Sequence, residues 1–596
     1  MADPPTGTHF HGPAHIGIVV GGNVGTVNLP PVVIPTAHEI AAPPSDFVGR
    51  ATECSGLIET LIQQAHRGGA VALIHGLGGV GKTALALRVA YLLRGAFPRQ
   101  VRLDLAGAGT SAMSSEAALG SAIRALGYDP QLPLPDTLDE LQRRYNSLVA
   151  GQPTLILADN AAGVAQVKPL LPPPGSALLV TSRQRFALPG AAGPADVDLA
   201  VLPQPDAETL LLAICDRIGD QAAALAKLCG CLPLALRISA SLLATTPRSV
   251  PGYLQTLADT RTKLQALRDP RNPDDPEANV AAAFTLSYDA LDPAAQDTLA
   301  QLSVFPAPFD EPAATAVVAL PPAATPVADH LELLHYRSLL DWDGTARYSL
   351  HDLVRAFAAG KLPAPDAVAL RHAEFYAVVA WQADKLYKTK DGMGEGLALF
   401  DGERLHIDAG WAWAHSHTPS DTAATVLMDY ADATAYIGDL RYHKRTERIP
   451  QLEAGLTAAR RLGRKDAEGA LLGNLGIAYT DLGEVRRAIG YHEQVLTIMR
   501  EIGDRRGEGN ALGNLGTAYA YLGEVRRAIG YYEQVLTIMR EMGNQQGEGS
   551  TLGSLGSAYT ALGEPRQAIG YYEQALTIMR EIGDRRGEGS TLGSLG

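Results

Sequence analysis

Eight consecutive residues near the start of the chain have the types and spacing needed to hold phosphate groups. The segment Gly76-Leu-Gly-Gly-Val-Gly81-Lys82-Thr83 fits the pattern G-x-x-x-x-G-K-[ST] of a phosphate-binding loop. Such glycines let backbone N–H groups turn toward phosphate oxygens, at a helix N-terminus whose dipole favours an anion. Lys82 is expected to reach the β- and γ-phosphates, and the Thr83 hydroxyl to bind Mg²⁺. The pattern predicts contacts with ATP or ADP from Gly76, Gly78, Gly79, Val80, Gly81, Lys82, Thr83 and Ala84.

A second group with suitable chemistry is the carboxylate of Asp159, which ends the apolar run 155–159. A protein with a phosphate loop needs such an acid at a strand end to hold Mg²⁺, so we assign Asp159 to the same metal as Thr83. The alternative is that Asp159 only caps the next helix. Asn160 stands where many fast ATPases carry a second acid, and an amide is a poor general base. We therefore expect any ATP hydrolysis to be slow, as in a switch rather than a metabolic enzyme.

Four further motifs follow one another along the chain. They are Phe47-Val48-Gly49-Arg50, Thr181-Ser182-Arg183, Cys231-Leu-Pro233-Leu-Ala and Leu350-His351-Asp352. Together with the phosphate loop they resemble the NB-ARC branch of the STAND signalling ATPases, over residues 46–362. Segments 284–291 and 302–306 are similar to the start of the winged-helix subdomain of that family.

The resemblance implies a role for each motif. Val48, Arg50 and Pro233 would lie against the adenine, and His351 would bond the β-phosphate of ADP. Arg183 would read the terminal phosphate and act in catalysis with Lys82 and Asp159. Taken singly, Arg183 could be a surface arginine, Pro233 a helix-start residue and His351 a structural histidine.

Apolar runs alternate with helical patterns between residues 46 and 205. The strand-like runs are 71–75, 101–105, 155–159, 178–182 and 197–202. Strand–helix alternation predicts a parallel sheet covered on both faces. We therefore expect a multidomain chain with an α/β P-loop NTPase domain, a helical subdomain and a winged helix, followed by an all-α solenoid.

The solenoid is predicted from a 40-residue repeat that starts at Gly473. In the second repeat, the spacing predicts one helix over 508–522 and another over 525–542. Leu515-Gly516-x-x-Tyr519, then Ala528 and Tyr532, resemble the tetratricopeptide repeat. Gly516 and Gly530 lie inside these helices at a cost of about 1 kcal/mol each, so we expect both to permit close helix–helix approach.

One stripe of the first repeat helix changes between repeats while the core positions stay fixed. Positions 474, 477 and 481 read Asn-Ile-Asp, and the next two repeats read Asn-Thr-Tyr and Ser-Ser-Ala. The resemblance places this stripe in the concave groove, which suits recognition of a protein or peptide ligand. The alternative is unselected drift on a solvated surface.

The segment 1–45 is rich in Gly, Pro and His. Residues 9–29 alternate apolar side chains, carry no Asp, Glu, Lys or Arg, and look like the short amyloid-type signalling motifs found ahead of NLR-like switches. Such a motif would contact an effector. A flexible tail, or a hairpin around residues 21–23, is the alternative.

Composition excludes several classes. The chain has 596 residues and a formal charge of −14, so a long basic surface for nucleic acid is not its overall design. Four cysteines are too few for a disulfide framework. No apolar run approaches the roughly 20 residues of a membrane span, and the N-terminus lacks the pattern of a signal peptide. These features predict a cytoplasmic protein without a membrane partner.

We infer an intracellular STAND-type sensor in which ADP/ATP exchange drives opening and homo-oligomerisation, for defence or regulation. The alternatives are a transcriptional regulator of the NB-ARC/tetratricopeptide type without its DNA-binding domain, and a passive scaffold that holds ADP structurally. The predicted parts are a flexible segment 1–45, a nucleotide-binding domain 46–205, a helical subdomain 206–275, a winged-helix subdomain 276–362, a helical linker or degenerate repeats 363–470, and tetratricopeptide repeats 471–596.

Overall fold

The computed structural model describes residues 14–20, 23–29, 40, 42–107, 112–129, 132, 134–135, 137–191, 193–268, 276–322, 324–389 and 391–595. The chain forms two compact units, Met1–Trp413 and Ala414–Gly596. Each unit is described by itself below.

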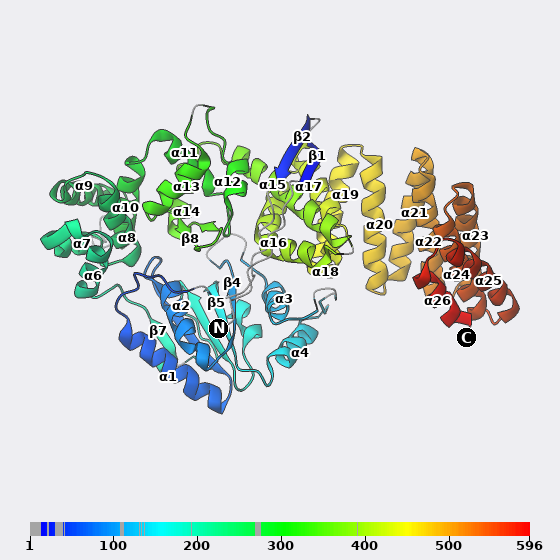
Figure 1. Cartoon of the computed structure of the whole chain (residues 1–596), viewed down its shortest axis with the longest axis horizontal. Helices are drawn as coiled ribbons and strands as arrows, with labels where there is room; N and C mark the ends of the chain where they lie inside the picture. The colour runs from blue at the N-terminus through cyan, green and yellow to red at the C-terminus, as the bar shows by residue number, and fades with distance from the viewer. Residues whose placement is uncertain are drawn as a thin grey trace. The chain divides into compact units, whose positions relative to one another are not determined.

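The first unit contains a five-stranded parallel sheet, as the alternation of strands and helices predicts (Figure 1). The strand order is β4-β5-β6-β3-β7, so β6 lies between the strand that leads into the phosphate loop and the strand that carries Asp159. The strands are β3 (Ala70–His75), β4 (Arg99–Asp104), β5 (Thr154–Ala161), β6 (Ala177–Ser182) and β7 (Asp196–Asp198).

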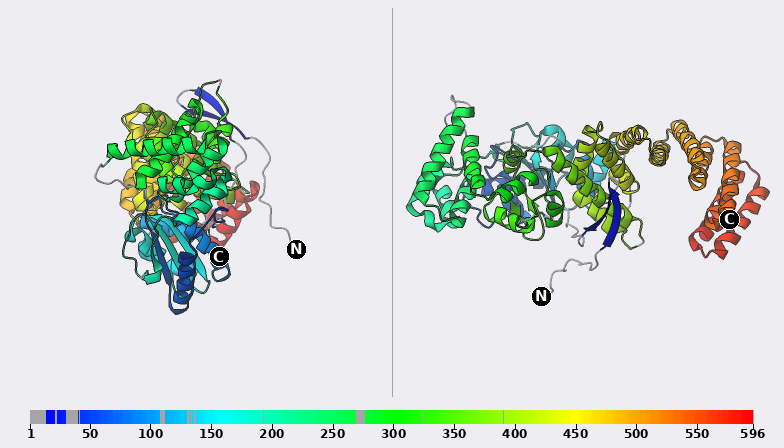
Figure 2. Two further views of the ribbon diagram at one scale, coloured as in Figure 1. Left: turned by 90° about the vertical axis from the view of Figure 1, so that its left-hand side faces the viewer. Right: turned by 90° about the horizontal axis from the view of Figure 1, so that it is seen from above.

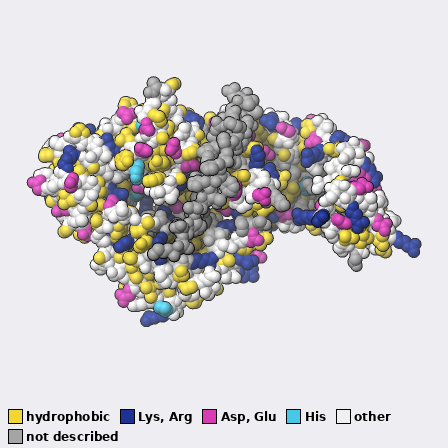
Figure 3. Space-filling view, in the orientation of Figure 1, with side chains coloured by type: hydrophobic (Ala, Val, Ile, Leu, Met, Phe, Trp, Pro, Cys, Tyr) yellow, Lys and Arg dark blue, Asp and Glu magenta, His cyan; other side chains and the backbone are white. Residues whose placement is uncertain are grey.

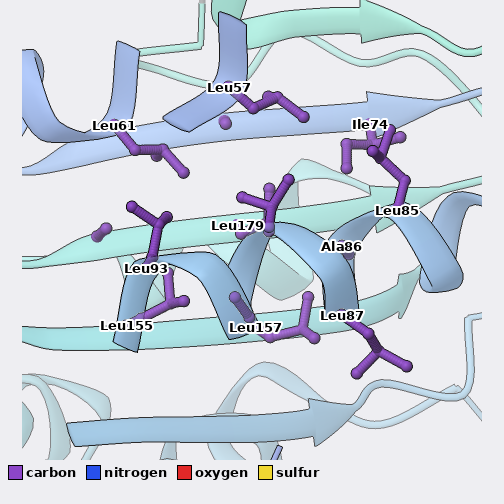
Figure 4. Close-up of a cluster of buried hydrophobic side chains, with 14 of the residues drawn as sticks. Leu57, Leu61, Ile74, Leu85, Ala86, Leu87, Leu93, Leu155, Leu157 and Leu179 are labelled. Atoms are coloured by element: carbon purple, nitrogen blue, oxygen red, sulfur yellow. The ribbon is translucent and has the colours of Figure 1, made fainter. Parts of the chain in front are cut away.

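Helices cover both faces of this sheet because its inner strands are apolar on both sides. On one face, leucines of α1 and α2 pack on Ile74, Leu157 and Leu179 of the strands (Figure 4). On the other face, α3 and α4 cover a second cluster that includes Leu73 and Ile156. The four helices are α1 (Ala51–Arg67), α2 (Lys82–Leu92), α3 (Ser115–Ala125) and α4 (Leu138–Val149).

Helices dominate the rest of the first unit. A short antiparallel hairpin, β8 (Asp341–Trp342) with β9 (Tyr348–Ser349), precedes α14 and lies in the segment predicted to be a winged-helix subdomain. The helices are α5 (Val164–Val167), α6 (Gln204–Ile214), α7 (Ala222–Leu228), α8 (Pro233–Thr245), α9 (Val250–Arg268), α10 (Pro276–Asp289), α11 (Pro293–Leu302), α12 (Glu311–Val317), α13 (Val327–Tyr336), α14 (Asp352–Ala359), α15 (Pro365–Tyr387) and α16 (Met393–Ser416).

The second unit is helical, and its later helices stack pair by pair (Figures 1 and 2). In the second repeat the helices span Arg505–Tyr521 and Val525–Glu541, within three residues of the predicted bounds. The remaining helices are α17 (Asp421–Ala433), α18 (Ile437–Arg441), α19 (Ile449–Arg461), α20 (Lys465–Asp481), α21 (Val485–Ile502), α24 (Gln545–Ala561), α25 (Pro565–Glu581) and α26 (Arg585–Leu595).

The same contacts recur at every repeat. Two tyrosine rings stack between the paired helices, with centroids 5.4 Å apart for Tyr519 and Tyr531. At the next corner, Arg500 bonds Glu508 at 2.8 Å, and equivalent ion pairs recur every 40 residues from Arg460 to Arg580. Each repeat is therefore fixed to its neighbour in the same way, as in other solenoids.

Two of the glycines inside the repeat helices, Gly516 and Gly530, differ in their surroundings. A Cβ built on Gly516 would lie 2.6 Å from the ring of Tyr532, which confirms that this glycine permits close approach. A Cβ built on Gly530 would meet nothing within 4 Å, so the prediction of close approach is wrong there. The reason is that Gly530 faces away from the neighbouring helices, and its carbonyl accepts a bond from the side chain of Gln534.

Near the N-terminus, β1 (Ala14–Val20) pairs antiparallel with β2 (Asn23–Leu29), and Val20 lies opposite Asn23. This backbone matches the hairpin alternative for the segment. Residues 1–13, 21–22, 30–39 and 41, where a flexible tail was also predicted, lie outside the described residues. The amyloid-type interpretation stays a prediction.

Within the described parts of the chain, no helix has both the length and the apolar character that a membrane crossing requires. On the face seen in Figure 3, basic and acidic side chains are interspersed, so this face presents no field of one sign.

The two glycines give a matched test of the repeat packing. Gly530→Ala should stabilise the chain by about 1 kcal/mol, because alanine is the better helix former and the site is open. Gly516→Ala should destabilise it, because the ring of Tyr532 must move. Thermal unfolding followed by circular dichroism would measure both, and equal shifts in the same direction would contradict this packing.

Candidate functional site

The phosphate loop connects β3 to α2, as predicted, and its glycines adopt conformations that other residues rarely take. The φ angles of Gly76, Gly79 and Gly81 are +141°, +76° and +96°. The Lys82 ammonium donates to the carbonyls of Gly76 at 2.9 Å and Leu77 at 2.7 Å, so it lies over the loop. Of the remaining loop residues, Val80 is buried and Ala84 is half-buried.

The surroundings of Lys82 disfavour its charge. Burial and the nearby positive charge of Arg183 lower the pKa of Lys82 to about 8, while Asp159 and Asp352 oppose this shift. A desolvated cation that donates to the carbonyls of Gly76 and Leu77 is well matched to an anion. The arrangement therefore fits phosphate groups.

The Asp159 carboxylate is almost completely buried and accepts hydrogen bonds on both oxygens. Oδ1 accepts from the hydroxyl of Thr83 at 2.9 Å and from that of Thr181 at 2.5 Å. Oδ2 accepts from the guanidinium of Arg102 at 2.7 Å. Burial raises the pKa of Asp159, but Arg102 and the two hydroxyls outweigh it, and the net pKa lies below the usual range.

The strand order explains why these donors meet. Successive strand residues point to opposite faces, so Asp159 shares the α2 face with Leu155 and Leu157. Thr83 comes from the first turn of α2, and Thr181 from the adjacent strand β6. The predicted pair of Thr83 and Asp159 is thus brought together. Because Mg²⁺ takes oxygen ligands and uses one or two carboxylates, these residues fit the metal.

Residues of the winged-helix segment reach the same place. Asp352 Oδ2 accepts from Arg183 at 3.0 Å and from the side-chain amide of Asn160 at 3.3 Å. The next residue, Leu353, would lie 3.1 Å from a Cβ built on Gly78. One carboxylate and one leucine therefore join α14 to the phosphate loop and to the ends of β5 and β6.

The amide of Asn160 has a second consequence, because it contacts the Asp352 carboxylate. Its backbone has a φ of 57°, and its N–H donates to Thr181 at 2.9 Å. An acid at position 160 would place a second carboxylate about 3.3 Å from Asp352, where like charges repel. The amide thus suits the contact with Asp352 as well as being a poor base.

His351 precedes α14 and caps it. Its Nδ1 accepts from the N–H of Leu353 at 3.2 Å. Burial lowers the pKa of His351, against the acids Asp341 and Asp352, and the charges of Arg183 and Lys82 lower it further. His351 therefore lies within electrostatic reach of the phosphate loop, and its contact with a β-phosphate stays a prediction.

Pro233 is the first residue of α8 and lies beside the phosphate loop. Its Cγ would be 3.9 Å from a Cβ built on Gly81, and the N–H of the next residue, Leu234, donates to the carbonyl of Gly79 at 3.3 Å. The contact with adenine predicted for Pro233 is not tested by this geometry.

The segment before α1 is bonded to the chain just before α6 and to α8. Arg50 is buried and donates to the carbonyl of Ala200 and to Glu53. Asp46 pairs with Arg237 of α8 at 2.9 Å, and Val48 between them is half-buried. Arg50 thus bonds Ala200 and Glu53, and its role at the adenine stays a prediction.

Three charged residues near the phosphate loop were not predicted from the sequence to belong to the site. The motif containing Asp352 predicts no role for this residue, although it contacts Arg183 and Asn160. Arg102 and Asp104 lie on β4, where Val101 and Leu103 alternate with them and point to the opposite core. In register, Asp104 lies opposite Asp159. The alternation of β4 together with the strand order could have placed both on the α2 face.

Comparisons with known proteins agree with this fold. Residues 453–541 and 551–586 match family models of the tetratricopeptide repeat. The chain is 37% identical over 383 residues to the regulatory protein AfsR of Streptomyces coelicolor, a match covering 60% of this chain and 38% of that protein. It is 40% identical over 329 residues to AfsR of Streptomyces griseus, covering 54% and 33%. The chain thus spans little more than a third of these relatives.

Among solved structures, the chain is similar to a Signal Transduction ATPase with Numerous Domains (STAND) protein from Pyrococcus horikoshii that has a tetratricopeptide repeat sensor. The identity is 18%, the match covers 94% of this chain and 87% of that one, and the TM-score is 0.45. A likeness this distant carries no argument about function.

The protein consists of an α/β phosphate-loop domain and a helical tetratricopeptide solenoid that follows it in the sequence, as the motifs predict. The tetratricopeptide part of the predicted resemblance is confirmed by the family models over residues 453–541 and 551–586.

The pKa of Lys82 can be measured without any ligand. Its amine should become reactive toward an acylating reagent with a midpoint near pH 8, because burial and Arg183 disfavour its charge. Peptide mass spectrometry after pulse labelling across pH 6–11 would report the midpoint, with exposed lysines of the same chain as references. A midpoint near 10.5 would show that the loop is solvated.

Proposed function

We propose that the protein is a nucleotide-controlled switch in which tetratricopeptide repeats sense a ligand and the nucleotide-binding domain changes its contacts between ADP and ATP. The observation that carries this proposal is the ion pair between Asp352 and Arg183 at 3.0 Å. It joins the winged-helix segment to the residue predicted to read the terminal phosphate.

The switch rests on a competition for Arg183. One guanidinium can pair with the Asp352 carboxylate or with a terminal phosphate, and both choices neutralise the same charge. With a diphosphate, Arg183 keeps Asp352 and holds α14 over the loop. With a triphosphate, Arg183 turns to the phosphate and releases Asp352. The nucleotide then shifts the population between two arrangements by its different contacts in each.

The phosphates are held by residues of the loop. The backbone N–H groups of residues 76–83 and the Lys82 ammonium bind them, at the start of α2. Thr83 and Asp159 would hold Mg²⁺, which neutralises phosphate charge when bound. His351 adds a contact to the β-phosphate, and Pro233 with Val48 and Arg50 cover the base. Asn160 supplies no base, so hydrolysis is slow.

The solenoid supplies the sensing surface. In the stripe predicted to line the groove, Ile477 and Tyr521 are 42% and 70% exposed, and Asp481 is exposed but paired with Lys444. Exposed apolar and aromatic side chains beside Asn474 and Asn514 suit a peptide with an apolar side chain and an extended backbone. Ligand binding would favour ATP exchange, opening and homo-oligomerisation, and an effector could be contacted through residues 9–29.

Regulation is the output that the comparisons favour over defence. The two relatives are named regulatory proteins, and each shares about 40% identity over more than 300 residues with this chain. The alternative transcriptional regulator of the NB-ARC/tetratricopeptide type therefore remains the second candidate. A passive scaffold with structural ADP is the third.

The nucleotide content of the purified chain tests the switch. Protein purified from cells should carry ADP, and size exclusion should give a monomer with ADP and a larger species with a non-hydrolysable ATP analogue. The same elution volume with both nucleotides would favour the scaffold.

Changes at the α14 contact should loosen ADP. Asp352→Asn removes the charge that pairs with Arg183, and His351→Ala removes the predicted β-phosphate contact, so both should speed ADP release about tenfold or more. Stopped-flow release of a fluorescent ADP analogue measures the rate. Asp343→Asn serves as the control, because Asp343 bonds only its own turn at residues 345–347. An unchanged release rate for both variants would refute the role of this contact.

A further inference from the structure

The edge strand β4 carries a cation that points at the site. Val101 and Leu103 pack into the core covered by α3 and α4. Arg102 lies on the opposite face, where the side chain of its neighbour Gln100 donates to the carbonyl of Ala90 in α2 at 2.8 Å. The strand pattern therefore brings the Arg102 guanidinium to the α2 face, where the Asp159 carboxylate also lies.

This cation contacts the carboxylate that a phosphate-loop protein offers to its metal. Arg102 donates to Asp159 Oδ2 at 2.7 Å, while Oδ1 accepts from the two threonine hydroxyls. The Asp159 side chain is 5% exposed and that of Arg102 is 33% exposed. Every oxygen of the carboxylate has a donor, and its charge is matched without a divalent ion.

A second carboxylate lies nearby. Asp104 is opposite Asp159 in the register of β4 and β5, and both acids favour the charged form of Arg102, whose pKa is raised despite burial. Without Arg102, two carboxylates would face each other at one end of the sheet. Such a pair strongly attracts a divalent cation, whereas an arginine paired with one of the two carboxylates weakens that attraction.

We propose that Arg102 makes ADP binding by this chain independent of Mg²⁺, by supplying at Asp159 the positive charge that a divalent ion would otherwise bring. The inference rests on the proposed nucleotide site. It adds that this site does not require Mg²⁺ in order to bind ADP. The diphosphate itself is held by the loop amides and Lys82, neither of which needs the metal.

The test measures ADP affinity of the full chain, stripped of nucleotide, by isothermal titration calorimetry in EDTA and in Mg²⁺. The two dissociation constants of the unchanged chain should agree within about threefold. Arg102→Met should weaken ADP binding in EDTA by about tenfold or more, because two carboxylates then face the site without a counter-ion, and Mg²⁺ should restore it. Arg102→Lys keeps the charge and should remain largely independent of Mg²⁺.

The matched control is Arg143→Met, which removes one positive charge from the exposed surface of α4 in the same domain. It should bind ADP like the unchanged chain in both buffers. A tenfold loss of affinity in EDTA for the unchanged chain would overturn the inference even if Arg102→Met failed to fold. Equal affinities of Arg102→Met in both buffers would overturn it as well. Absence of ADP binding by the unchanged chain in either buffer would refute the nucleotide switch itself.

Discussion

The buried carboxylate of Asp159 is the interaction on which the rest of the site depends. A charged group removed from water must be hydrogen-bonded or paired, since burying it alone costs several kcal/mol. The donors that satisfy it come from α2, from β6 and from β4. One side chain therefore fixes the phosphate loop relative to three neighbouring strands, and this fixes where Lys82 and Arg183 can reach.

A second carboxylate, that of Asp352, extends this network to the winged-helix segment. It is only partly buried, so its contact with Arg183 is weaker than a buried pair and can be exchanged. Leu353 and Leu234 pack on glycines of the phosphate loop from two different segments. The loop is thus the place where α2, α8 and α14 meet. A change in the bound nucleotide can therefore alter the contacts of all three.

The solenoid follows a simpler rule, because each repeat meets only its neighbours. Stacked tyrosines and one Arg–Glu pair per corner recur with little change, so packing there is local and the 40-residue period reveals it. The surface positions are less constrained. A side chain at position 516 would collide with Tyr532, whereas position 530 has room for one. Both glycines recur with the same spacing in every repeat. Spacing alone therefore does not show which face of a helix is covered.

The sequence by itself determined the elements and the phosphate loop, since strand and helix periods, glycine spacing and the Lys-Thr pair are local properties of the chain. It also brought Thr83 and Asp159 into one predicted site, because a loop of this pattern needs an acid at a strand end. The partners of Asp159 on β4 and of Arg183 on α14 were decided only by the tertiary structure. Arg102 lies 57 residues from Asp159, and Asp352 lies 169 residues from Arg183. Strand order and the packing of helices bring such distant charges together. No local sequence pattern predicts these contacts.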